Sequence, residues 1–529
     1  MGIVTVSERR SIAATSLLYV HMAPELILAG GRIRTLGRAG LHAHSHLAVT
    51  SGRVVAAGGA EILGLRGPRT RVVQLQGDAV LPGFNDAHAH VVYYGLTRFG
   101  AELGGTRDVV EIAARLRVHG RRLSDGEWQQ GMGFRSSELA EKRPPDRTEL
   151  DSATGKRPAF IDERGGHLRV ANSAALAAAS ITAATPDPHG GRIGRGPDGT
   201  PNGVLLESAM RLVADVQPHP TRARRTEAIL RAQRLLISRG ITSVGAAVNR
   251  GFADDLLCYE RLEAAGRLAM RVHEFLSWEL LEAASQLGIR AHFGGDRLRA
   301  GPIKVFIDGG AERVAMRGGP SMWRTTPHEL KELVSRASIN GLQVAAHAIG
   351  DGAIEAMCDA VHAAGATHLR HRVEHCTVCP PDLRRRLARL RMVAVMQPLA
   401  AGFARQSTEL FPARDRNDIA AHGPLIKAGV RVAFSSDLPV TPDPNPWPGM
   451  RAAIDDPVNG VSILEALRAY TSGGAYASFD ENGKGTLEPG MLADLQVYAG
   501  DPLEAPPERW KALRPRAVLV GGALAFGSL

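Results

Sequence analysis

The middle of the chain alternates short apolar runs with amphipathic stretches, and this alternation limits the fold more than any other feature. Apolar runs bounded by turn residues favour buried strands, and the stretches between them, such as TPHELKELVSRASIN and DGAIEAMCDAVHAAG, have helical spacing. We expect eight strands, at AVLPGFNDAHAHV (79–91), 241–247, 269–276, 302–307, 342–348, 371–376, 392–397 and 430–437. The pattern predicts an α/β fold, a (β/α)8 TIM barrel, with its functional residues at the carboxyl ends of the strands.

The rest of the chain is assigned around this barrel. Barrel strand 1 lies in 81–99 and the remaining barrel in 226–482, whereas 100–225 is too long for one strand-to-helix connection and is predicted to be an inserted lid domain. Short strand runs with Gly-rich turns at both ends predict a small β-sandwich built from both termini, 23–80 and 483–529. Residues 1–22 resemble a poor signal peptide; because a strand run begins near Met22, we favour an N-terminal extension.

Composition excludes several functional classes. The 529 residues are 44% hydrophobic and 22% charged, as in a soluble globular protein, and are too many for one core. The net charge of +10 comes from scattered arginines and not from basic blocks, so we expect no nucleic-acid partner. Without an apolar run of 18 residues, no membrane partner is expected either. Only four cysteines, presumed reduced, favour a cytoplasmic protein.

Side chains that can bind metal ions recur at the predicted strand ends. Alternate residues of a strand face the same way, so His88 and His90 can share one cavity. Further ligand-type residues fall in or at the ends of later strands: Lys304, His347, His375 and Asp437. Such groups, buried together without partners, would be costly, and their convergence at one rim favours a divalent metal ion.

Nearby residues of similar type are interpreted differently. Glu374 is expected to point away from His375, because neighbours along a strand alternate. His42, His44 and His46 alternate as well, but they precede the barrel, so we interpret them as a solvated strand face. The lone CxxC of Cys376 and Cys379 is interpreted as packing.

The ordered motifs LPGFNDAHAH, GITSVGAA, IKVFIDGG, QVAAHAIGD, HRVEHC, VMQP, FSSDLPV and LEPGMLADL, with GGHLRVANSAAL in the insertion, carry a family resemblance. From residue 23 onward the chain resembles the amidohydrolase superfamily, in the subgroup that includes N-substituted formamide deformylases. The resemblance implies a zinc centre of one or two ions. One metal would be held by His88 and His90, and a second by His347 and His375. Lys304, carboxylated by CO2, would bridge them, and Asp437 would contact the metal-bound water.

The alternative is a site for one metal ion, built from the histidines and Asp437, because Lys304 lies inside its strand run and not at its end. His167, in the insertion, is interpreted as a substrate contact. We expect hydrolysis of a non-peptide carbon–nitrogen amide bond in an N-formyl or small N-acyl compound. A metal-bound hydroxide would attack and Asp437 would shuttle the proton.

Two other functions are kept open, hydrolysis of a cyclic amide or lactone at the same site and a non-catalytic barrel scaffold. The expected partner is a small-molecule substrate, and assembly into a homo-oligomer is also left open.

Overall fold

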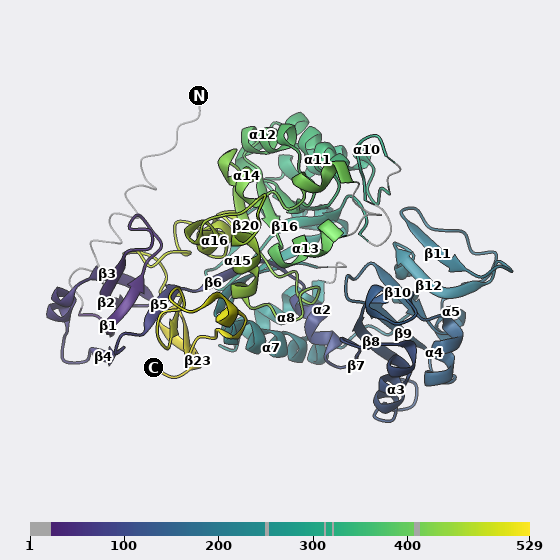
Figure 1. Ribbon diagram of the computed structural model, residues 1–529, viewed down its shortest axis with the longest axis horizontal. Coiled ribbons are helices and arrows are strands. Elements are labelled where there is room, and N and C mark those ends of the chain that lie inside the picture. Colours follow the sequence, from purple (N-terminus) through teal and green to yellow (C-terminus); the bar gives the residue numbers. More distant parts are fainter. Residues whose placement is uncertain (1–22, 249–252, 311–313, 320–321, 407–412) are drawn as a thin grey trace.

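The strands of the residues that the structure describes form three sheets (Figure 1). The computed structural model describes residues 23–248, 253–310, 314–319, 322–406 and 413–529, so the extension expected at 1–22 lies outside the described residues. Among the helices of these residues, none combines the length and apolar character needed to cross a membrane.

The middle of the chain forms a nearly closed barrel of parallel strands. In order around the sheet they are β6 (Phe84–Ala89), β13 (Ile241–Ala246), β14 (Arg271–Ser277), β16 (Leu298–Phe306), β17 (Val344–Ala348), β18 (Arg372–His375), β19 (Val393–Met396) and β20 (Arg431–Phe434). Backbone bonds from Asp437 N to His88 O (2.9 Å) and from His90 N to Leu438 O (2.8 Å) bring the last strand against the first. Eight barrel strands are therefore confirmed, but the run expected at 79–91 divides into β5 (Ala79–Pro82), which joins another sheet, and β6. A short strand, β15 (Phe293–Gly294), adds to β16.

Helices surround the barrel because their apolar faces pack on its outer surface. In α10, for example, Thr326 and Glu329 form a capping box, and Leu330, Val334 and Ala337 are buried. The helices are α2 (Val91–Thr97), α7 (Arg222–Ser238), α8 (Ala253–Ala264), α9 (Leu281–Gln286), α10 (Pro327–Ile339), α11 (Asp351–Ala364), α12 (Pro381–Arg389), α13 (Pro398–Gln406), α14 (His422–Lys427), α15 (Pro446–Ile454), α16 (Ile463–Ala469) and α17 (Ser472–Ala477). Short 3-10 helices are η1 (Ala60–Leu65), η2 (Ser136–Glu138), η3 (Trp278–Leu280), η4 (Thr367–Leu369), η5 (Ala413–Asp418) and η6 (Pro507–Ala512).

Both ends of the chain contribute to one sheet beside the barrel, as expected. It contains β1 (Leu26–Arg34), β2 (Ala43–Thr50), β3 (Arg53–Gly58), β4 (Arg71–Gln74), β5 (Ala79–Pro82), β21 (Leu495–Tyr498), β22 (Ala517–Val520) and β23 (Ala523–Gly527). The two ends meet where β5 pairs antiparallel with β21. Buried apolar residues from several of its strands, such as Leu28, Leu47 and Leu495, form its core. Whether this terminal sheet is a sandwich stays a prediction.

The insertion folds around its own sheet on the opposite side of the barrel (Figure 1). Its strands are β7 (Ala101–Glu102), β8 (Gln129–Phe134), β9 (Ala159–Glu163), β10 (Leu168–Ala171), β11 (Gly191–Arg195) and β12 (Pro201–Glu207), and its helices are α3 (Val109–Gly120), α4 (Arg147–Thr154), α5 (Ser173–Ala178) and α6 (Met210–Ala214). A separate core includes Ile112, Phe134 and Ile161. The domain boundaries and the role of a lid stay predictions.

Candidate metal centre

His88 and His90 lie where the first barrel strand ends. His88 is the penultimate residue of strand β6, and His90 directly precedes α2. Their ring centroids are 5.2 Å apart and both residues are buried. The strand-end spacing therefore brings the two imidazoles together, as the sequence predicted.

Asp437 joins this pair from the carboxyl end of the last barrel strand. It follows β20 in a turn with φ +53°, and its Oδ1 lies 3.5 Å from His88 Nε2 and 3.3 Å from His90 Nε2. The ligand atoms of the three residues all lie within 4.8 Å of one another. In the part of the chain that the structure describes, this is the one place where three or more His, Cys, Asp or Glu side chains meet closely enough to hold a metal ion.

His347 and His375 extend the cluster to the middle strands. The two rings are 4.5 Å apart, and the His375 ring lies 5.4 Å from that of His88. His375 ends β18 with φ +73°, and its Nδ1 is 2.8 Å from Oε1 of Gln397, which fixes the ring. All four predicted histidines of the barrel rim are thus in one cluster.

Lys304 is buried beneath this cluster. Its Nζ lies 4.6 Å from the centroid of the Phe306 ring and has no hydrogen-bond partner among the described residues. Burial lowers the pKa of Lys304 to about 8, although Glu374 and Asp437 favour its charged form. A fraction of neutral amine is therefore present near neutral pH, which is the form that can react with CO2.

The surroundings set the charges of the other groups. Burial and the charge of Lys304 hold the pKa of His88 well below its ordinary value, and burial beside His375 does the same to His347. Burial would raise the pKa of Asp437, but its interactions with His90, His375 and His88 outweigh that effect and lower it. Neutral imidazoles around a carboxylate are the forms that coordinate a cation.

Glu374 contacts the cluster through His88. Its Oε2 accepts a hydrogen bond from His88 Nδ1 (2.6 Å), and Arg372 Nε donates to Oε1 (2.7 Å). The two neighbours on β18 have different partners, because Glu374 bonds to His88 of the first barrel strand, whereas His375 bonds to Gln397. A carboxylate on Nδ1 fixes the tautomer that leaves Nε2 free for a metal. The signal in the sequence is the RVEH strand, where Arg372 and Glu374 share a face.

The donor set fits a divalent cation. His88 Nε2 and Asp437 Oδ1 are buried, face each other, and lack hydrogen-bond partners within the described residues. Buried polar atoms are normally satisfied, so two such atoms converging on one point indicate a ligand there. Imidazole nitrogen and carboxylate oxygen are ligands that zinc accepts.

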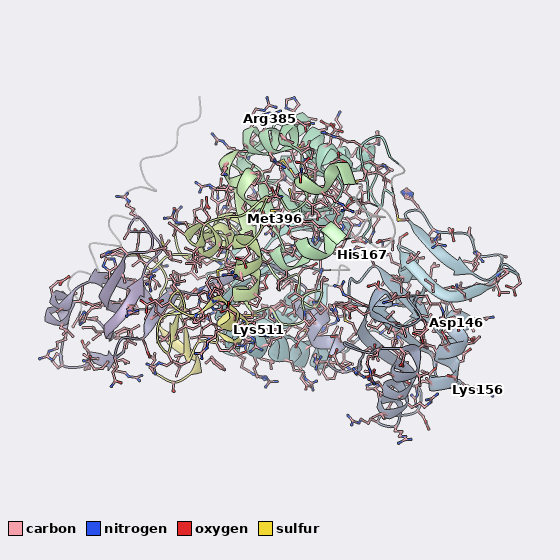
Figure 2. All side chains as sticks on the ribbon, in the orientation of Figure 1. Asp146, Lys156, His167, Arg385, Met396 and Lys511 are labelled. Atoms are coloured by element: carbon pink, nitrogen blue, oxygen red, sulfur yellow. The ribbon has the colours of Figure 1, made fainter. Side chains whose placement is uncertain are left out.

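The site opens toward the insertion. A cavity of about 990 Å³ is lined by His347, His375 and Asp437 and, from the insertion, by His167. The ring of His167 is 5.4 Å from that of His347. Figure 2 shows His167 where the insertion meets the barrel. Its position is compatible with the predicted substrate contact, which stays a prediction.

The histidines and cysteines that were not assigned to the metal site take no part in the group of His88, His90 and Asp437. His44 and His46 are on β2 of the terminal sheet; His46 is buried, so the expected solvated face is wrong for that residue. Cys376 and Cys379 are free and buried, in keeping with packing.

A nearly closed parallel barrel with a ligand cluster at its carboxyl rim is typical of metal-dependent hydrolases. The model of the amidohydrolase family matches residues 71–526, and the chain belongs to that family.

Individual relatives agree with this assignment. The chain is 29% identical to the N-substituted formamide deformylase of Arthrobacter pascens, over 95% of this chain and 98% of that protein. Among solved structures it is similar to an uncharacterized metal-dependent hydrolase from Pyrococcus furiosus (TM-score 0.73, 28% identity, covering 90% of this chain and 100% of that one). A second, from Pyrococcus horikoshii, has a TM-score of 0.75 at 26% identity and covers 91% and 99%.

Proposed function

We propose that this amidohydrolase cleaves a non-peptide carbon–nitrogen amide bond, in an N-formyl or another small N-acyl compound. The observation that carries the proposal is the convergence of His88, His90 and Asp437, with His88 Nε2 and Asp437 Oδ1 buried and facing each other. The choice of substrate class is supported by the similarity to a protein named as an N-substituted formamide deformylase.

The residues that would hold metal fall into two groups. His88, His90 and Asp437 would hold one zinc ion, and His347 and His375 a second, with carboxylated Lys304 between them. Lysine binds a cation only after carboxylation, because an ammonium group has no lone pair. When bound, zinc acts as a Lewis acid that polarises the scissile carbonyl and lowers the pKa of water to ~7.

The chain itself supplies proton transfer and orientation. Asp437 is held ionised, so its carboxylate can take a proton from the attacking water and return it to the leaving nitrogen. The Glu374 carboxylate keeps the His88 ring turned so that Nε2 faces the site. The products are a carboxylic acid, which is formate for a formyl substrate, and an amine.

The direct test is a substrate panel on zinc-loaded protein whose metal content has been measured. N-butylformamide, N-butylacetamide, γ-butyrolactone, 2-pyrrolidone and glycylglycine cover the amide, lactone, cyclic amide and peptide classes. We expect amine release from the N-acyl compounds, fastest from the formamide. Turnover of the lactone or the cyclic amide alone would replace the proposal with that chemistry. Protein that binds no metal and turns over none of the five would support a non-catalytic barrel.

A further inference from the structure

A second imidazole–carboxylate pair, formed by half-buried His167 and buried Glu207, lies at the junction of insertion and barrel. His167 precedes β10, Glu207 ends β12, and the backbone N–H of Glu207 donates to His167 O (3.0 Å). The His167 Nδ1–H donates to Glu207 Oε2 at 2.8 Å. The Glu207 side chain is 1% exposed, and the residue has φ +52°, a conformation that non-glycine residues rarely adopt.

The same carboxylate connects the insertion to the barrel. The N–H of Gly310, in the loop after β16, donates to Glu207 Oε1 (2.8 Å), and Arg324 lies 3.4 Å from Oε2. A Cβ at position 310 would lie 2.7 Å from His167 Nε2, so the absence of a side chain there lets the ring approach the loop. Glu207 is therefore bonded to both sides of the junction and to the ring between them.

This pair repeats the arrangement beneath the metal centre. Glu374 holds Nδ1 of His88 and leaves its Nε2 toward the site; Glu207 holds Nδ1 of His167 in the same way. The His167 ring lies beside that of His347 and lines the cavity that contains Asp437. A bridge that served stability alone would not need its imidazole in this cavity.

We propose that Glu207 is a positioning residue, which orients His167 so that its Nε2 forms a hydrogen bond with the scissile amide of the substrate. The inference rests on the proposed function. The insertion then completes the active site as well as covering it. The orientation does not depend on the protonation state of His167, because Nδ1 carries a proton in both the neutral tautomer bonded to Glu207 and the imidazolium form.

A double-mutant cycle tests this coupling. With N-butylformamide as substrate, His167→Ala should lower kcat/KM by about 10- to 100-fold, the usual cost of a charge-assisted hydrogen bond. Glu207→Ala should cause a similar loss in the wild-type background and less than about a twofold further loss in His167→Ala. Glu207→Gln keeps a carbonyl acceptor for Nδ1–H and should recover part of the activity. Glu138→Gln, on the exposed face of the insertion, is the matched control and should change kcat/KM less than about twofold.

Losses that add independently, at unchanged metal content, would overturn the proposal.

A second measurement needs no turnover. Diethylpyrocarbonate labels His167, and the rate is followed by mass spectrometry with and without acetohydroxamic acid, which binds metal and occupies the amide position. We expect protection of His167 in the wild type and in Glu207→Gln, and weaker protection in Glu207→Ala. Equal labelling with and without the hydroxamate would contradict the proposal. If the wild type fails to turn over N-butylformamide, the proposed function fails, and protection alone then decides the role of the pair.

Discussion

Asp437 combines two properties that a proton carrier needs, a fixed position and a charge retained despite burial. Its N–H donates to His88 O, which fixes the turn, and the surrounding histidines keep its carboxylate ionised. A buried carboxylate without such neighbours would tend to be protonated already, and it would then be unable to accept a proton. Its chemistry therefore depends on the residues that the first strand contributes.

Replacing Asp437 by Asn should lower kcat by about 10²- to 10⁴-fold, since an amide cannot accept the proton of the attacking water. Steady-state kinetics on protein of measured zinc content separates this effect from loss of metal. Asp455→Asn, an exposed acid at the end of α15, is the control and should keep full activity. Full turnover by Asp437→Asn with its metal retained would show that another group carries the proton.

Lys304 decides between one metal ion and two. Lys304→Met keeps the length and packing of the side chain but cannot be carboxylated, so the bound zinc should fall from two ions per chain to one. Mass-spectrometric metal analysis measures this directly, with Lys331→Met on α10 as the control. One zinc ion per chain in both the wild type and Lys304→Met would favour the site for one metal ion, and two in both would show that Lys304 does not bridge them.

At the scale of elements, the barrel strands could be predicted because each consists of an apolar run with its own local pattern. The rim residues His88, His347 and His375 followed from the same pattern, since strand ends converge. Glu374 could not be placed, because its partner His88 is 286 positions away and the curvature of the barrel, not local alternation, brings them together. Glu207 was missed for a similar reason: its bond to His167 depends on how two strands of the insertion pair.

The junction of insertion and barrel should be most stable in weakly acidic solution. Burial alone would lower the pKa of His167, but Glu207 raises it above the ordinary 6.5; burial would raise the pKa of Glu207, but His167 and Arg324 lower it from 4.5 to about 2. The contribution of the histidine is complete below pH 6.5 and is lost as pH rises through its higher folded pKa. The contribution of the carboxylate is complete above pH 4.5 and is lost as pH falls toward 2.

The difference in melting temperature between wild type and Glu207→Gln should therefore be largest between pH 4.5 and 6.5 and shrink on either side. Differential scanning calorimetry across a pH series measures it. Glu138→Gln should give a small difference that does not depend on the charge of His167. A pH-independent difference for Glu207→Gln would mean that the pair does not ionise as described.

At the scale of the whole molecule, a buried ion pair joins the barrel to the terminal sheet. Arg271 on β14 donates from Nε to Asp494 Oδ2 (2.6 Å) and from a terminal nitrogen to Oδ1 (2.8 Å). The Asp494 carboxylate also accepts from Gly521 N (2.7 Å), and the N–H of Gly83 donates to its carbonyl (2.8 Å). Asp494 thus connects both ends of the chain to β14, which is separated by one strand from β6, the strand that carries His88.

Asp494→Ala should therefore lower the free energy of unfolding by about 3–5 kcal/mol, because it leaves the Arg271 guanidinium buried without its partner. Urea denaturation followed by tryptophan fluorescence measures the change, and Asp455→Ala, which removes an exposed pair with Arg451, should cost less than about 1 kcal/mol. The double variant Arg271→Met with Asp494→Ala removes both charges and should recover part of the loss. If the single and double variants were equally unstable, the cost would come from the lost bond to Gly521 and not from an uncompensated charge. Backbone contacts would then hold the terminal sheet to the barrel, and the ion pair would contribute little to the free energy of unfolding.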